Sequence, residues 1–98
     1  MPEFYDVVHA KVRDGAEEDM LRRRPALEAG VREKLPGLVD IRLIRLEDGT
    51  YIDLLRWESR EAADAAIEKF AEVPEAGEIH QFLGGGDLAH HRGEVVEG

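Results

Sequence analysis

The stretch that decides the fold runs from Tyr51 to Val73 and reads YIDLLRWESREAADAAIEKFAEV. It begins with a short apolar run after the turn dipeptide Asp48-Gly49, as is typical of a half-buried strand. Ser59 is suited to cap the start of a helix, and apolar residues recur beyond it at helical spacing. The apolar face of this helix comprises Ala62, Ala63, Ala66, Ile67, Phe70 and Val73. Its small alanines predict that the helix packs flat on the sheet, with Trp57, the one tryptophan of the chain, at the junction.

The segments on either side alternate between strand and helix patterns. Runs that favour β-structure predict strands over residues 4–13, 38–46, 50–58 and 87–96, and helical patterns cover residues 17–35, 59–73 and 75–83. Pro25 lies inside the first helical run, where it removes a hydrogen bond, so we expect either a kink or a separate turn before it. The glycine run 84–86 predicts a flexible link into the last strand.

The order of these elements is β-α-β-β-α-β, with an extra helical turn before the last strand. This order predicts the α+β class with a ferredoxin-like architecture, in which an antiparallel sheet carries helices on one face. The 98 residues show no internal repeat, so we expect residues 1–98 to form a single domain.

The hairpin predicts which strand residues share a face. A two-residue loop would pair Glu47 with Thr50 and bring Asp40 opposite Trp57. Because side chains alternate between faces, one face would be mostly aliphatic and the other mixed. The mixed face would hold Asp40, Arg42, Ile44, Tyr51, Asp53, Leu55 and Trp57. Neither face is a simple solvent-exposed one, and the helices suffice for only one, so we expect a homodimer whose two sheets pack together.

Composition excludes several classes of function. The chain has no cysteine, which rules out disulfides, thiolate metal sites and thiol nucleophiles. Its formal net charge of −9 argues against binding to nucleic acid or to anionic membranes. No apolar run is long enough to span a membrane and no export signal is visible, so we expect a cytoplasmic protein. The four histidines lack metal-binding spacing, so no metal site is predicted.

Three segments carry a resemblance to a known family. They are VHAKVRDGAEEDML near the start, LPGLVDIRLIRLEDGTYIDLLRWESREAADAA in the middle and GEVV near the end. Together they resemble the antibiotic biosynthesis monooxygenase domain family, whose members are small dimeric α+β barrels. The resemblance covers nearly the whole chain and implies a pocket between the helices and one sheet face. Active members of the family include oxygenases that oxidise polycyclic phenols without metal or flavin, and haem-degrading enzymes.

Departures from the family pattern exclude part of this chemistry. Haem-degrading members use an asparagine on the first strand, a tryptophan at a strand end and a histidine on the second helix. Trp57 matches the tryptophan, but Val8 and His9 lie near the asparagine position. Ile67 lies about where the histidine would be, and the chain has no asparagine. Haem degradation is therefore disfavoured and no cofactor is expected. The quinone-forming oxygenases also rely on an asparagine, so their mechanism is not carried over whole.

The candidate residues each have a functional and a structural interpretation. Trp57 would stack on an aromatic substrate, or it is a core tryptophan that fixes the helix to the sheet. Asp53 would take a phenolic proton, or it belongs to an ordinary buried pair or a dimer contact. His80, on the segment expected to cover the mouth of the pocket, is a second candidate base or a surface histidine. The remaining residues predicted to line the substrate pocket are Tyr51, Arg42, Asp40 and His9.

Two functions follow from these observations. The first is a cofactor-independent, monooxygenase-like enzyme that acts on a small aromatic or polyketide-like molecule. The second, favoured by the missing asparagine, is a dimeric domain that binds a small ligand or has a structural role without catalysis. A fully packed space around Trp57 would argue against the enzyme, and an open cleft faced by His80 would argue for it.

Overall fold

The structure is a computed structural model that describes residues 3–83 and 89–98, apart from the side chains of Ala71 and His80. Its elements are β1 (Phe4–Ala10), α1 (Glu17–Lys34), β2 (Leu38–Arg45), β3 (Tyr51–Trp57), α2 (Arg60–Lys69), a 3₁₀ turn (Phe70–Glu72), α3 (Pro74–His80) and β4 (Ala89–Glu94). Every predicted strand and helix is present, although most are shorter than predicted. The glycine run 84–86 lies outside the described residues.

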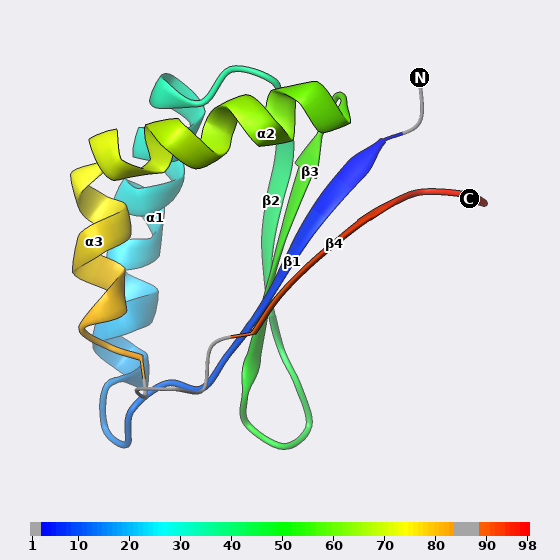
Figure 1. Cartoon of the computed structure of the whole chain (residues 1–98). Helices are drawn as coiled ribbons and strands as arrows, with labels where there is room; N and C mark the ends of the chain where they lie inside the picture. The colour runs from blue at the N-terminus through cyan, green and yellow to red at the C-terminus, as the bar shows by residue number, and fades with distance from the viewer. Residues whose placement is uncertain (1–2, 84–88) are drawn as a thin grey trace.

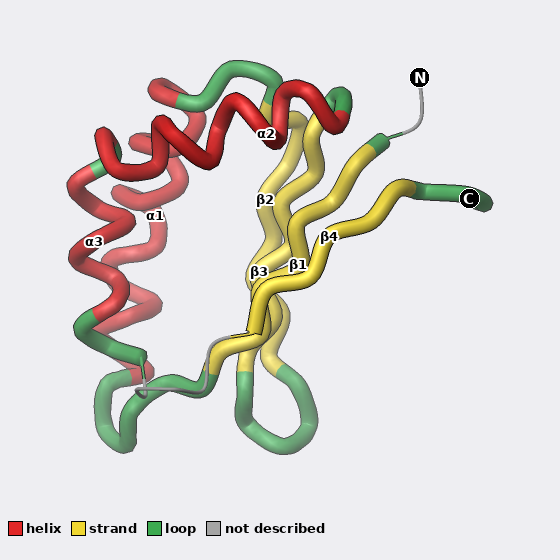
Figure 2. The backbone as a smooth tube through the Cα atoms, viewed as in Figure 1, coloured by secondary structure: helices red, strands yellow, loops and turns green. Residues whose placement is uncertain are grey.

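The strands form one antiparallel sheet in the order β2-β3-β1-β4. The helices lie on one face of this sheet (Figure 1). Figure 2 shows the same two layers, with α1 and α3 side by side and opposite the strands. This arrangement confirms the predicted α+β, ferredoxin-like fold.

The hairpin loop between β2 and β3 holds three residues rather than the predicted two. The backbone N–H of Leu46 donates to the carbonyl of Thr50 at 2.8 Å, which closes the loop one residue earlier than expected. Gly49 has a left-handed conformation with φ of +89°, as a three-residue hairpin loop requires near its end. The predicted register is therefore wrong by one residue.

This shift changes which residues share a face with Trp57. The residues that face the helices are Ile41, Leu43 and Arg45 on β2, and Tyr51, Asp53, Leu55 and Trp57 on β3. The prediction for β3 is thus confirmed. The prediction for β2 is wrong: Asp40 and Arg42 lie on the outer face, by which we mean the sheet face that carries no helix.

α1 is a single helix of 18 residues that continues through Pro25. The alternative of a separate turn before Pro25 is therefore wrong. Met20, Leu27 and Val31 are buried along one side of α1, and this tertiary packing offsets the backbone hydrogen bond that proline lacks.

α2 begins as predicted, because Ser59 accepts a hydrogen bond from the backbone N–H of Ala62 at 3.1 Å. Ala63 and Ala66 are buried, but Ile67 of the predicted apolar face is 52% exposed. Figure 1 shows α2 crossing the ends of β2 and β3 at the top of the view. The small alanines therefore allow close packing at one end of the sheet rather than along it.

Gly37 allows α2 to lie close to the start of β2, because it has no side chain. Its φ is +93°, and a Cβ built on it would lie 2.6 Å from the Cβ of Ala62. Its carbonyl also accepts a hydrogen bond from the backbone N–H of Glu58 at 2.9 Å. A side chain is excluded here both by backbone conformation and by space.

Replacing Gly37 with alanine should destabilise the fold more than the matched replacement of Gly49. Both glycines have positive φ, which costs an alanine about 1–2 kcal/mol, but nothing lies within 4 Å of a Cβ at Gly49. The clash with Ala62 should add about 1–3 kcal/mol at Gly37. Urea denaturation of both variants measures the difference, and equal losses of unfolding free energy would contradict this account.

Candidate functional site

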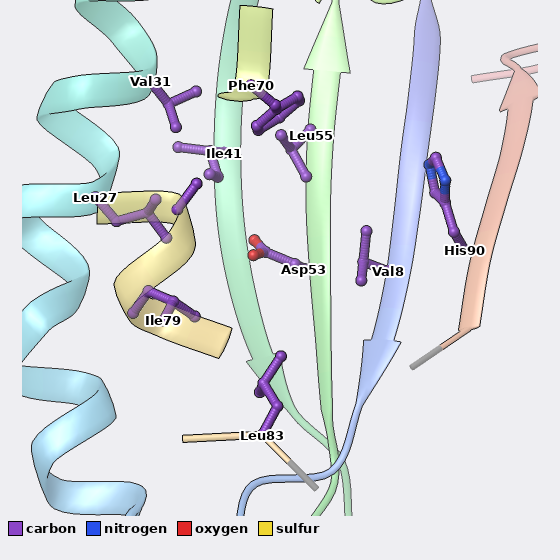
Figure 3. A pocket seen from close by; sticks show the side chains of 11 residues that line it. Val8, Leu27, Val31, Ile41, Asp53, Leu55, Phe70, Ile79, Leu83 and His90 are labelled. Carbon is purple, nitrogen blue, oxygen red and sulfur yellow. The ribbon is translucent and has the colours of Figure 1, made fainter. Parts of the chain in front are cut away.

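A cavity of about 250 Å³ lies between the helices and the sheet (Figure 3). Its apolar walls comprise Val8, Leu27, Val31, Ile41, Leu55, Phe70, Ala76, Ile79 and Leu83. Among the described residues, Asp53 and His90 are the polar side chains that line it. A concave and largely apolar space with a few polar groups is typical of small-molecule sites.

The strand register brings the polar groups of the cavity into one row. Val8 of β1 pairs with Asp53 on β3 and with His90 on β4. Figure 3 shows these three side chains on neighbouring strands. In the next row, Asp6 of β1 pairs with residues of the same two strands. The central position of β1 therefore joins residues that lie far apart in the sequence.

Asp53 is held by a buried arginine of α1. Arg24 donates from Nη1 to Oδ2 at 2.7 Å and from Nη2 to Oδ1 at 3.0 Å. The Arg24 side chain is 6% exposed and that of Asp53 is 23% exposed. A cation buried this deeply requires a partner, so the pair fixes α1 against β3. Both carboxylate oxygens are engaged by Arg24, so Asp53 is better suited to accept a further hydrogen bond than to act as a base.

His90 is bound to a buried carboxylate that sequence reasoning missed. Asp6, 5% exposed, accepts hydrogen bonds from His90 Nε2 at 2.8 Å, Trp57 Nε1 at 2.8 Å and Arg92 Nε at 2.9 Å. The available signal was the alternation along β1, in which a charged residue interrupts the apolar series Phe4, Val8 and Ala10 on the face toward the helices. A charge on such a face needs donors around it.

Arg92 links this cluster to α2. Its Nη1 lies 2.9 Å from Oδ1 of Asp64, while its Nε binds Asp6. Burial lowers the pKa of Arg92, but the hydrogen bonds to Asp64 and Asp6 outweigh burial and raise it above its usual value. The guanidinium also lies 4.9 Å from the ring centre of Phe4. Arg92 is therefore a permanent cation fixed between helix and sheet.

Trp57 and Tyr51 are buried and do not line the cavity. Trp57 is 0% exposed within the hydrophobic core, which fits a core tryptophan and leaves no free ring face for stacking. By the criterion set from the sequence, this packing around Trp57 argues against the enzyme, and the cavity described above lies apart from Trp57. The hydroxyl of Tyr51 accepts a hydrogen bond from Arg45 Nε at 3.1 Å, and this bond raises the pKa of Arg45. Tyr51 lines a smaller recess of about 60 Å³ together with Asp53.

Three of the predicted pocket residues lie on the outer face, away from the cavity. Arg42 Nε donates to Asp40 Oδ2 at 2.9 Å, and this bond lowers the pKa of Asp40. His9 Nε2 lies 2.8 Å from the hydroxyl oxygen of Thr50. The structure therefore separates Asp40, Arg42 and His9 from Asp53. The side chain of His80 lies outside the described part of the chain.

The segment after α3 closes one end of the cavity. Leu83, at the bottom of Figure 3, lines the cavity and forms an isolated bridge with Val12. The backbone N–H of Arg13 donates to the carbonyl of Phe82 at 2.8 Å, and its Nε donates to the carbonyl of Leu83 at 3.2 Å. These few bonds join two segments outside the regular strands.

The described residues of the site fit neither a metal ion nor haem. Within residues 3–83 and 89–98, no group of three or more histidine, aspartate and glutamate side chains could hold a metal ion. The cavity does not fit haem, because it is smaller than the roughly 300–1,000 Å³ of drug-sized pockets and the imidazole in the described part of its wall, that of His90, is engaged by Asp6. Of the helices described, none is long and apolar enough to cross a membrane.

Comparison with known proteins gives structural neighbours only. No protein-family model and no curated protein matches the sequence. A mutant of SnoaB, a cofactor-independent oxygenase from Streptomyces nogalater, has a TM-score of 0.78 at 19% identity and covers 98% of this chain and 95% of its own. The haem degrader MhuD from Mycobacterium tuberculosis has a TM-score of 0.76 at 24% identity and covers 97% of each chain.

Other neighbours carry the name of the family that the sequence resembles. One is a candidate antibiotic biosynthesis monooxygenase from Caulobacter crescentus, with a TM-score of 0.74 at 20% identity, covering 98% of this chain and 92% of its own. At these identities the likeness shows the fold. The protein thus has the fold of the antibiotic biosynthesis monooxygenases over nearly its whole length.

Replacing Arg24 with methionine should cost about 2–4 kcal/mol of unfolding free energy. It leaves Asp53 without its cation, and the loss falls below that of a fully buried pair because Asp53 is 23% exposed. Arg22→Met on the exposed side of α1 is the matched control and should change stability by less than about 0.5 kcal/mol. Adding Asp53→Asn to the Arg24 variant should restore part of the loss. Similar losses for Arg22 and Arg24 in chemical denaturation would contradict a stabilising role for the pair.

Proposed function

We propose that this protein is a monooxygenase-like enzyme that oxidises a small aromatic or polyketide-like molecule without metal or flavin. Residues 1–98 would act as one domain within a homodimer. The main support for the proposal is that the imidazole of His90 lies on the wall of a largely apolar cavity. The shared fold with a cofactor-independent oxygenase supports the same class of reaction.

The cavity favours a small, neutral molecule that carries a hydroxyl group. Its walls come from both the helices and the sheet, so a bound ring system would be removed from water. The ionised Asp53, paired with Arg24, has lone pairs left to accept a hydrogen bond from a ligand hydroxyl. The same carboxylate disfavours an anionic ligand. A neutral phenol or enol meets these conditions.

His90 would remove the proton that activates this substrate. Imidazole is the commonest general base in enzymes, and this one lies across Val8 from Asp53. Loss of a proton from an anthrone-type CH₂ group leaves an electron-rich anion that reduces O₂ directly. The CH₂ group becomes a carbonyl, one oxygen atom enters the substrate and the other leaves as water. His90 takes the part first given to Asp53, because Asp53 is paired with Arg24, while the same role for His80 stays a prediction.

A second function is favoured by a specific observation. The complete burial of Trp57, together with the lack of asparagine in the chain, removes two groups on which related oxygenases rely. The cavity would then bind a small ligand without chemistry. Both functions need the cavity, and only the first needs His90 as a base.

The homodimer is proposed from the outer face of the sheet. Ile44 of β2 is 40% exposed there, and Ile52 and Leu54 of β3 lie on the same face. These apolar side chains form a patch on a sheet face that carries no helix, next to the charged pair Asp40 and Arg42, and such a patch needs a cover. A second copy of the chain is the expected cover, because the family that the sequence resembles forms dimeric barrels.

Oxygen uptake with a panel of anthrones and hydroquinones tests the enzyme. Metal-depleted protein should consume O₂ above the spontaneous rate, and His90→Gln should lose about 10²–10⁴-fold of this activity. His91→Gln is the matched control, because His91 follows His90 on β4 with its side chain on the outer face, and it should keep the wild-type rate. An unchanged rate in the His90 variant would rule out His90 as the base.

Calorimetry with the same compounds separates the two functions. Binding without oxygen uptake for every compound would favour the non-catalytic function. Ala76→Phe, which would place a ring in the cavity, should abolish binding in either case. Undiminished binding by this variant would show that the ligand sits elsewhere.

Ile44→Asp should convert the dimer to a monomer in sedimentation equilibrium. A carboxylate at the centre of an apolar interface is desolvated without a partner. Ile67→Asp is the matched control, since Ile67 is 52% exposed on α2, away from the outer face. Dissociation by both variants, or by neither, would argue against sheet-to-sheet packing.

A further inference from the structure

Among the described residues, Asp6 is a buried carboxylate that accepts three side-chain hydrogen bonds, and it has no role in the proposed proton transfer. Its side chain is 7% exposed and receives donors from both neighbouring strands. Oδ2 accepts from Trp57 Nε1, and Oδ1 accepts from both His90 Nε2 and Arg92 Nε. Three donors on one buried group leave it little freedom to rotate.

We infer that Asp6 is a positioning residue that fixes the tautomer of His90, with the proton on Nε2 and the free lone pair on Nδ1. The inference deepens the proposed function, on which it rests for its catalytic meaning. Nδ1 is then the atom that accepts the proton of the substrate.

The chemistry of the two groups dictates this tautomer. An ionised carboxylate has no proton to donate, so the ring nitrogen that faces Asp6 must be the donor. A neutral imidazole carries only one N–H, and the other nitrogen is therefore an acceptor. Within the part of the chain that the structure describes, no hydrogen bond to Nδ1 of His90 occurs. His90 lines the cavity with a side chain that is 45% exposed, so we take this acceptor nitrogen as the one that meets a ligand.

Arg92 holds Asp6 in the orientation that this role needs. Its guanidinium donates to the same oxygen as His90 and is itself held by Asp64 of α2. The guanidinium therefore limits the rotation of the Asp6 carboxylate. The position of His90 on the edge strand β4 is thus tied through Arg92 to the helix layer.

Trp57 then contributes through Asp6 and not through stacking. Its indole N–H occupies Oδ2, which leaves Oδ1 to His90 and Arg92. Trp57→Phe keeps the buried ring but frees Oδ2, so Asp6 can rotate. Such a variant should lose turnover while its KM stays within about twofold of wild type, because no ring face of Trp57 touches the cavity.

The direct test is the ¹⁵N spectrum of the histidine rings near pH 8, where neutral imidazole tautomers are distinguished by their two nitrogen shifts. The His90 signals are assigned by their loss in His90→Gln. Wild type should show Nε2 protonated and Nδ1 free. Asp6→Asn should populate the other tautomer, because an amide can donate to Nε2. Asp64→Asn is the matched control: it removes the other carboxylate on Arg92, keeps Asp6, and should leave the wild-type tautomer.

The same variants give a kinetic readout. Asp6→Asn should lower turnover about 10–100-fold with little change in KM, as is usual when the partner of an active imidazole is lost. A wild-type His90 with its proton on Nδ1 would overturn the inference, and this measurement decides even if Asp6→Asn fails to fold. An Asp6→Asn spectrum identical to wild type would also overturn it. If no compound is oxidised but the tautomer changes as expected, the proposed oxidation fails while the assignment of Asp6 holds.

Discussion

The buried carboxylate of Asp6 needs hydrogen-bond donors, and much of the fold depends on supplying them. A charge removed from water is costly unless it is paired and hydrogen-bonded, and β1 by itself supplies no donor to it. Because β1 is central, one donor comes from Trp57 on β3, and two come from His90 and Arg92 on β4. The strand order β2-β3-β1-β4 therefore serves charge compensation as well as apolar packing. Arg92 extends this compensation to α2 through Asp64.

The buried guanidinium of Arg24 likewise requires a partner from another element of the fold. Arg24 joins α1 to Asp53 of β3, across a space that is otherwise apolar. Asp53 and His90, the polar residues that line the cavity, thus each belong to one of the two charge clusters. Stability and ligand preference are coupled in such a design, because any change to a polar wall residue also removes a partner from a buried charge.

Sequence patterns were sufficient for the fold and for part of the site. The β-α-β-β-α-β order, the Ser59 cap and the common face of Tyr51, Asp53 and Trp57 depend on local signals, and the structure shows all of them. The register of β2 could not be predicted from the sequence, because Asp48-Gly49 is compatible with loops of two or three residues. The one extra loop residue places Arg42 on the outer face. The Asp6–His90 pair could not be found locally. It joins residues 84 positions apart and requires the register of β1 against β4, which no turn dipeptide specifies.

The isolated bridge between Val12 and Leu83 has a consequence for how the cavity exchanges its contents. Leu83 lines one end of the cavity, and among the described residues it is held by this isolated bridge and by one hydrogen bond from Arg13 Nε, while the backbone N–H of Arg13 donates to the neighbouring Phe82. Segments with so few bonds open at a small fraction of the cost of global unfolding. A molecule bound in the cavity could therefore leave by a local opening at this end, while the sheet and its charge clusters stay intact. Its residence time would then depend on the chain segments at residues 12–13 and 82–83 as well as on the polar groups of the wall.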